Sequence, residues 1–195
     1  MVTGTVERDA SIHRSLTKAL VRSILEVPAG RRWVMQDIGL LAVWLDDGRQ
    51  HRLHLWDAAS AVGDPPIHDH PFDFTSTVVA GEITNTVYEE SPSGVEYQRE
   101  RYSPHDEQGR ITDTVRLAGS STRVAAGQTY NQAAHQLHCS SHTPGTITIL
   151  RPWFKPVSPL TVCRAPGSPW NSGRARPASA REVSRITAAA LELMA

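Results

Sequence analysis

The chain has 195 residues, and its 20 Lys and Arg residues balance 20 Asp and Glu residues, so it carries no formal net charge. This length predicts one compact domain with a sizeable core, and the balanced charge provides no general attraction to nucleic acid or to an anionic membrane. We therefore expect neither of them as a partner.

Three further features indicate a cytoplasmic protein. The two cysteines, Cys139 and Cys163, are too few for a disulfide framework, which favours a reducing compartment. The N-terminal residues lack the basic stretch and the apolar stretch that together mark a signal peptide. The longest apolar run, Ile38 to Leu45, is far shorter than the about 20 residues that span a membrane.

The first predicted element is a helix over residues 6–27. Apolar side chains recur at helical spacing from Ile12 to Ile24, which gives this helix one apolar face. Pro28 and Gly30 then end it, because neither residue favours a continued helix.

Beyond residue 33 the pattern changes to short β-rich runs separated by turn residues, which predicts strands. The runs are Trp33–Gln36, Ile38–Leu45, Gln50–Trp56, Thr75–Val79, Glu82–Tyr88, Val95–Tyr102, Thr112–Leu117, Thr122–Ala126, Ile147–Leu150 and Pro159–Arg164. In the third run, Arg52, His54 and Trp56 alternate on one face. That face either lines a polar cavity or is solvated, and we favour the cavity because the run leads directly to His68.

The stretch from Pro65 to Tyr88 is the most informative part of the chain. His68 and His70 alternate with Asp69, so on an extended strand both imidazoles point to the same side. Neutral imidazole is the commonest metal ligand in proteins, and two on one face supply half of a metal site. The alternative is a pair of surface histidines, but the neighbouring β-rich runs and a second histidine cluster favour metal binding.

That second cluster follows Gly127, where His135, His138 and His142 fall within eight residues. One of these histidines would complete the site. His135 and His138 face opposite ways if they lie on one strand, so both bind metal only where a turn intervenes. We expect Cys139 to face away from His138 as a small buried hydrophobic residue.

The C-terminal part predicts a linker followed by a helix. Residues Pro166–Pro177 are rich in Pro, Gly and Ser. Ser179 and Glu182 then fit a capping box at the start of a helix over residues 179–194. Many short strands between two terminal helices predict an antiparallel β-barrel or jelly roll with the helices packed outside.

The two histidine stretches resemble the two motifs of the cupin superfamily. In the first motif one glycine precedes H-x-H and another closes the motif, and Gly63, His68, His70 and Gly81 occupy these positions here. In the second motif, counting from the opening glycine places the characteristic histidine at His138. The resemblance covers about the middle half of the chain.

This resemblance implies that residues 1–195 form a single all-β cupin domain. Its barrel, a cupin-type double-stranded β-helix or jelly roll, would span residues 33–164, with the helices of residues 6–27 and 179–194 outside it. Because cupins are often dimers formed by strand exchange, the resemblance also implies a homodimer.

The chain departs from the first motif at its glutamate, whose position is occupied by Phe74. Asp73 lies one residue earlier and substitutes for that ligand only if the chain turns at Pro71. The loss of the glutamate is similar to the thiol (cysteine) dioxygenase-like branch of the cupins, whose members bind iron through three histidines. By that resemblance, His68, His70 and a third histidine would hold Fe²⁺, with Zn, Ni, Mn and Cu left open because imidazole suits them all.

The identity of the third ligand has two answers at this stage. Counting along the motif favours His138, whereas aligning HQLHC with the corresponding stretch of thiol dioxygenases favours His135. We take His138 as the third ligand, with His135 or Asp73 as a base beside the metal or as a substitute ligand. Tyr130 is a candidate for a phenol in the cavity, with core packing as its alternative role.

We therefore predict a mononuclear non-haem Fe²⁺ dioxygenase or oxygenase that acts on a small organic substrate with O₂. Without a carboxylate ligand the complex would keep its full positive charge and favour an anionic substrate. Arg52, His54 and Arg151 would bind that substrate, the arginines by pairing with a carboxylate. The alternatives are a metal-dependent isomerase, epimerase or lyase, and a non-catalytic cupin that only binds a ligand.

Overall fold

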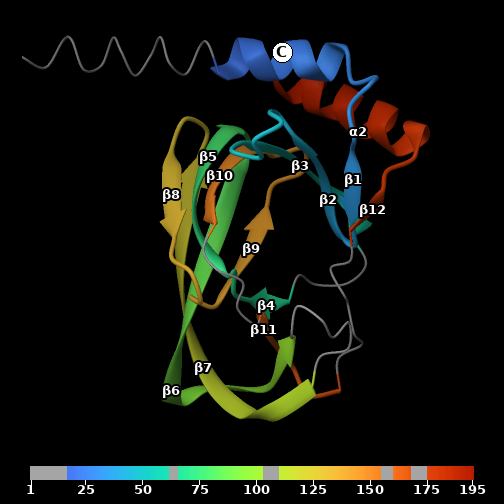
Figure 1. Cartoon of the computed structure of the whole chain (residues 1–195). Coiled ribbons are helices and arrows are strands. Elements are labelled where there is room, and N and C mark those ends of the chain that lie inside the picture. The colour runs from blue at the N-terminus through green and yellow to red at the C-terminus, as the bar shows by residue number, and fades with distance from the viewer. Residues whose placement is uncertain (1–16, 62–65, 103–109, 155–159, 168–174) are drawn as a thin grey trace, which may run out of the picture.

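The computed structural model describes residues 17–61, 66–102, 110–154, 160–167 and 175–195, so part of the predicted N-terminal helix and of the predicted linker lies outside it. Residues 17–26 are helical, and the other elements form two antiparallel sheets and one further helix (Figure 1). These elements are β1 (Val34–Gln36), β2 (Ile38–Trp44), β3 (Arg52–Ala61), β4 (Ile67–His68), β5 (Phe72–Ala80), β6 (Glu82–Tyr102), β7 (Arg110–Ala125), β8 (Thr129–Gln132), β9 (His138–His142), β10 (Ile147–Phe154), β11 (Leu160–Arg164), β12 (Ala175–Pro177) and α2 (Ala180–Leu193).

The strands β3 to β10 form one nested hairpin. β6 pairs with β7, and outward from there β5 pairs with β8, β4 with β9, and β3 with β10. Successive pairs alternate between the sheets, which gives the orders β3-β10-β5-β8 and β4-β9-β6-β7. This is the strand order of a jelly roll, so the all-β, cupin-type double-stranded β-helix predicted from the sequence is confirmed.

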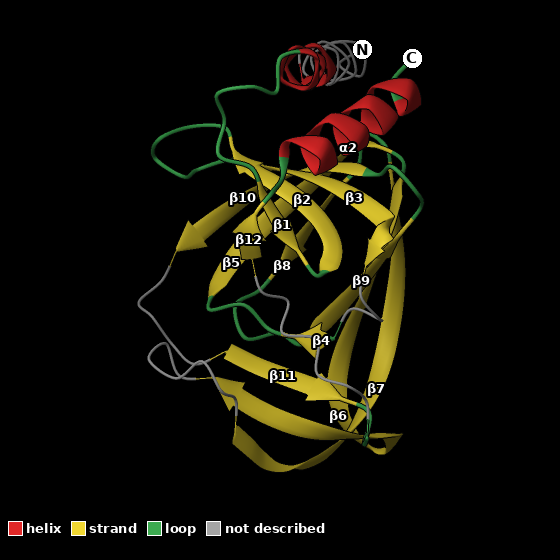
Figure 2. Cartoon of the chain, turned by 90° about the vertical axis from the view of Figure 1, so that its right-hand side faces the viewer, coloured by secondary structure: helices red, strands yellow, loops and turns green. Residues whose placement is uncertain are grey.

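The remaining strands widen the two sheets. β12, β1 and β2 extend the first sheet beyond β3 to seven strands, and β11 extends the second beyond β4 to five. The helices lie together at one end of the molecule, whereas the long β6 and β7 reach the opposite end (Figures 1 and 2). No helix in the described ranges combines the length and the apolar composition that crossing a membrane requires.

The alternation of β3 separates an apolar core from a polar interior. Leu53 and Leu55 are buried in a cluster that includes Val21 of the first helix and Ile186 of α2, so they face the helices. The intervening His54 is 6% exposed and points the other way, between the sheets. The polar face of this strand is therefore internal, and the solvated alternative is wrong.

The C-terminal helix begins as its sequence predicts. The Ser179 side chain accepts a hydrogen bond from the backbone N–H of Glu182, and the Glu182 side chain accepts one from the backbone N–H of Ser179. This reciprocal capping box satisfies two backbone donors that the first turn leaves free.

Two strands are longer than the sequence predicts. β6 and β7 continue through the positions where we expect breaks, including the glycine-bearing stretch around Gly119. Gly119 lies opposite Tyr88, and a Cβ there would lie 3.0 Å from the Tyr88 ring. The glycine thus makes room for a cross-strand aromatic side chain and does not form a turn. The predicted break before Val95 survives only as a register shift after Glu90.

β12, like β8 and β9, has no counterpart among the predicted β-rich runs. β12 lies in the Pro- and Gly-rich stretch read as a linker, and its Arg176 is the register partner of Met35 in β1. β12 is an edge strand of three residues, all exposed, so it lacks the apolar alternation by which strands are recognised.

We expect Gly81→Ala to destabilise the fold more than Gly30→Ala. Both glycines have positive φ, +78° and +79°, so each substitution would cost about 1–2 kcal/mol of backbone strain. At Gly81 the added Cβ would also collide with the Thr146 hydroxyl and lie 2.9 Å from its Cα, whereas nothing lies within 4 Å at Gly30. Overpacking adds about 1–3 kcal/mol, which urea denaturation resolves. An equal loss of unfolding free energy in the two variants would contradict the tight packing around Gly81.

Candidate metal centre

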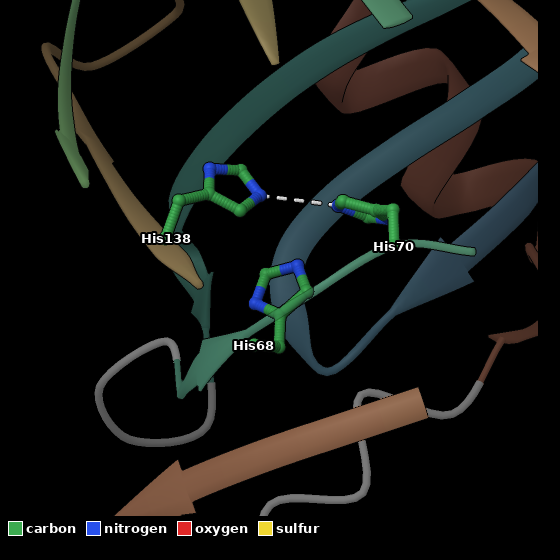
Figure 3. Close-up of side chains that lie close together, drawn as sticks. All are labelled: His68, His70 and His138. Carbon is green, nitrogen blue, oxygen red and sulfur yellow. Dashed lines mark hydrogen bonds between the residues drawn. The ribbon is translucent and has the colours of Figure 1, made fainter. Parts of the chain in front are cut away.

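Three histidines from two separate segments meet between the sheets. His68 ends β4, His70 follows two residues later, and His138 begins β9 directly opposite His68 in the antiparallel register. One ring nitrogen of each histidine lies within 4.8 Å of the corresponding nitrogens of the other two. Figure 3 shows the three imidazoles turned toward one another. This arrangement gives a divalent cation three nitrogen ligands on one side.

Hydrogen bonds place a proton on the outer nitrogen of two of these rings. His68 Nδ1 lies 2.9 Å from the backbone carbonyl oxygen of Pro66, which only accepts, so Nδ1 is the donor. His138 Nδ1 lies 2.8 Å from Asn85 Oδ1 and donates to it. In a neutral ring the other nitrogen, Nε2, then carries a lone pair. His138 Nε2 lies 3.1 Å from His70 Nε2, so its lone pair faces the second histidine.

Burial keeps these imidazoles neutral. Desolvation lowers the pKa of His68 and His70, and lowers that of His138 from 6.5 to about 3. The neighbouring histidines act in the same direction on His70 and His138, because two imidazolium ions this close repel each other. The neutral ring is the form that binds a metal ion, so the site is prepared for a cation at neutral pH.

An aromatic side chain occupies the position of the missing glutamate. Phe74 is 2% exposed, and its ring centroid lies 5.1 Å from that of His70 and 5.9 Å from that of His138. Asp73 faces elsewhere: its Oδ1 accepts a hydrogen bond of 2.8 Å from the backbone N–H of Ala134. Asp73 therefore braces the turn before β9, and its carboxylate is not part of the histidine group.

The structure brings His138, and not His135, to the other two histidines. His135 lies in that turn with a φ of +60°, and its side chain is 51% exposed. Its Nδ1 lies 3.5 Å from the buried Asp69 carboxylate, and its backbone N–H donates to the carbonyl of His70. His142, the third histidine of this stretch, packs against Trp56 with ring centroids 4.9 Å apart.

The predicted substrate residues divide into an internal pair and an external one. Within the described part of the chain, Arg52 Nε and His54 Nε2 are buried without a hydrogen-bond partner. Desolvation is the main cause that lowers the pKa of His54, and the charge of Arg52 lowers it further. The charge of Arg52 also contributes to the lowered pKa of His70, after desolvation and the neighbouring histidines. Arg151 is exposed, and its guanidinium lies over the exposed ring of Trp153, so the structure does not bring it to the histidines.

Tyr130 lies inside the barrel. Its ring centroid is 6.1 Å from that of Phe74, and burial raises its pKa even though Ser76 and Ser140 hydrogen-bond to it. It is therefore a neutral phenol next to the aromatic wall of the histidine group. Whether it takes part in chemistry stays a prediction.

Sequence reasoning missed two buried amides, Asn85 and Gln132, which are 6% and 1% exposed. Asn85 accepts the hydrogen bond from His138, and Gln132 contacts Asn85. The signal for Asn85 was present in the sequence: it shares one face of β6 with the apolar Ile83 and Val87. A polar side chain on an otherwise apolar strand face needs a buried partner.

Comparisons with known proteins find similar solved structures but no similar sequence. No family model and no curated protein matches the chain. Similar solved structures include Drosophila melanogaster CENP-C bound to CAL1, with 9% identity and a TM-score of 0.33 over 81% of this chain and 98% of that one. They also include the DMSP lyases RdDddP and RnDddQII, with 12% identity and a TM-score of 0.27 over 66% of this chain and 43% of that one.

A third similar structure is E. coli ycfD, with 15% identity and a TM-score of 0.36 over 91% of this chain and 44% of that one. The chain thus spans less than half the length of the lyase and ycfD chains. At these identities and TM-scores the likeness contributes no argument about function. The fold assignment depends on the strand order described above.

We expect the metal-free protein to lose stability as the pH falls below about 6.5, the ordinary histidine pKa. Below that pH the unfolded chain binds protons that the folded chain does not bind at its four buried histidine rings, which are His54, His68, His70 and His138. The free energy of unfolding therefore decreases as the pH is lowered. Each buried histidine contributes a slope of up to about 1.4 kcal/mol per pH unit. Urea denaturation in a chelating buffer measures this slope. His54→Leu should reduce it, and a slope equal to that of the parent would contradict the buried, neutral state of His54.

Proposed function

We propose that the chain is a mononuclear metal-dependent enzyme of the cupin superfamily, an Fe²⁺ oxygenase of the thiol dioxygenase-like type. The observation that carries this proposal is the convergence of His68, His70 and His138 with no carboxylate in the group among the described residues. Three neutral nitrogen ligands on one side leave coordination positions open on the other. When bound, Fe²⁺ would supply a centre at which an organic substrate and O₂ meet.

The ligand set also favours a class of substrate. Neutral imidazoles do not offset the charge of a divalent cation, and Phe74 in place of a glutamate keeps the wall beside them apolar. An anionic substrate would therefore be attracted to the site more strongly than a neutral one. Arg52 is half-buried, and its guanidinium, whose buried Nε lacks a hydrogen-bond partner, would pair with a substrate carboxylate.

The remaining interior residues would orient the substrate and exclude water. His54 offers an unpartnered Nε2 on the same face of β3 as Arg52. Tyr130 would present a neutral hydroxyl from β8, the edge strand of the same sheet. Asp73 and His135 would act through the turn before β9, since Asp73 accepts from the Ala134 N–H and the His135 N–H donates to the His70 carbonyl.

We expect protein purified without oxygen to contain near-stoichiometric iron that is lost in both His68→Ala and His138→Ala. His135→Ala is the matched control, because His135 lies in the same segment but outside the histidine group. Elemental analysis measures the metal content of each variant. Exposure to air should then consume O₂ and release iron from the parent.

Each alternative outcome has its own meaning. Iron retained in His138→Ala but lost in His135→Ala would reassign the third ligand. A bound metal ion that is stable in air without O₂ consumption would contradict the oxygenase and favour an isomerase, epimerase or lyase. The absence of any metal from the parent would overturn the enzyme proposal and leave a cupin that binds a ligand.

We expect Arg52→Met to weaken the binding of small carboxylates to the Co²⁺-loaded protein by about tenfold or more. A hydrogen bond to a charged group contributes about 1.5–3 kcal/mol, and tenfold in affinity is about 1.4 kcal/mol. Arg151→Met is the matched control, since it removes the same charge from an exposed position. The visible spectrum of Co²⁺ measures binding of acetate or cysteine, and equal effects of the two variants would contradict the role of Arg52.

A further inference from the structure

A chain of buried amides leads away from His138. His138 Nδ1 donates to Asn85 Oδ1 at 2.8 Å, and Asn85 Nδ2 donates to Gln132 Oε1 at 3.1 Å. Gln132 Nε2 in turn donates to the backbone carbonyl of Gln136 at 3.1 Å and to its side-chain oxygen at 2.9 Å. The chain thus joins β9, β6 and β8, and returns to the turn directly before His138.

The direction of this chain is set at its far end. A side-chain amide has a donor and an acceptor of similar shape and can turn over, but a backbone carbonyl only accepts. The Gln136 carbonyl therefore requires Gln132 to present Nε2, which leaves Oε1 toward Asn85. Asn85 must then present Nδ2 to Gln132 and Oδ1 to His138. Ser140 is compatible with this direction, because its hydroxyl can donate to the same oxygen, which lies 3.3 Å away.

The reverse direction of hydrogen bonding would place the His138 proton on Nε2 and so remove the lone pair with which that nitrogen could bind a metal ion. Turning over both amides would put Gln132 Oε1 against the Gln136 carbonyl, and Asn85 Nδ2 against His138 Nδ1. His138 Nδ1 would then accept, so its Nε2 would carry the proton and point it at His70 Nε2. Two carbonyl oxygens facing each other without a proton at this part-buried position are unfavourable, because an unsatisfied buried acceptor costs about 1–3 kcal/mol, so the observed direction is preferred.

We propose that Gln132 and Asn85 are positioning residues for His138. The Gln136 backbone carbonyl sets the direction of their hydrogen bonds, and this direction keeps the proton of His138 on Nδ1 and the lone pair on Nε2. We refer to Gln136, Gln132 and Asn85 together as the amide relay. The tautomer of His138 follows from the relay alone. The effect on metal affinity rests in addition on the proposed role of His138 as a ligand.

The carbonyl that starts the relay is itself held by the segment that carries His70. The Ala134 N–H donates to Asp73, and the His135 N–H donates to the His70 carbonyl at 2.9 Å. These two bonds tie the turn over residues 133–136, from which the Gln136 carbonyl projects, to the segment that carries His70. The relay therefore connects one histidine of the group to another through the interior of the barrel.

The experiment reads the His138 tautomer directly in the metal-free protein. Protein with ¹⁵N-labelled histidine gives separate shifts for a protonated and an unprotonated ring nitrogen, and His138→Ala assigns the signals. At neutral pH the parent should show His138 as the Nδ1–H form. Gln132 hydrogen-bonds to Asn85 and Gln136. The variant Gln132→Met should move the two nitrogen shifts of His138 toward each other as both tautomers become populated. Asn85→Leu should do the same by removing the acceptor.

Two control variants separate the relay from general damage to the fold. Asn85→Asp should retain the Nδ1–H form, because a carboxylate can only accept from His138. Gln136→Ala should also retain it, because the backbone carbonyl remains. Titration with Ni²⁺ by calorimetry should show affinity reduced by about 10- to 100-fold in Gln132→Met and Asn85→Leu, with smaller changes in the controls.

The outcomes distinguish the relay from the proposed function. An unchanged Nδ1–H form in both Gln132→Met and Asn85→Leu would overturn the relay, even if the parent binds metal. Loss of the Nδ1–H form in Gln136→Ala would overturn the role of the backbone carbonyl. If the parent shows the expected tautomer and responses but binds no Ni²⁺, the relay stands and the proposed metal site fails.

Discussion

The pairing of β4 with β9 is the contact on which the candidate metal centre depends. β4 has two residues, and its one register pair with β9 places His68 directly opposite His138. Because side chains alternate along an extended backbone, His70 then falls on the same side as His68. A shift of one residue in this register would turn His138 to the other face, where Cys139 now packs in an apolar cluster with Tyr88 and Leu137. The pairs on either side of it in the nested hairpin, β3 with β10 and β5 with β8, fix that register.

The features that depend on local chemistry could be predicted from the sequence. The H-x-H alternation places His68 and His70 together, and Ser179 with Glu182 marks the start of α2, because each pattern depends on residues within one turn or one strand. The jelly roll followed from the number of strands and the cupin resemblance, and it is confirmed. Metal binding and the roles of the site residues stay predictions.

The features that depend on distant partners could not be predicted. Motif counting and alignment gave different third histidines because neither shows that His135 lies in a turn and points outward. That turn is held by hydrogen bonds to His70 and Asp73. Gly119 looked like a break because its partner, Tyr88, lies on another strand. The interior position of His54 also depends on tertiary packing, since its alternation is compatible with either face.

The nested hairpin has a consequence for when the site can form. His70 and His138 are 68 residues apart in the chain, and two shorter-range pairings, β6 with β7 and β5 with β8, lie inside theirs. Closing long loops is entropically costly, so contacts between distant residues form more readily once the intervening chain is ordered. A chain emerging from the ribosome therefore contains His68 and His70, half of the candidate metal centre, before β9 has been synthesised. Tight capture of a metal ion would thus be delayed until the barrel is nearly closed, which couples loading of the site to completion of the fold.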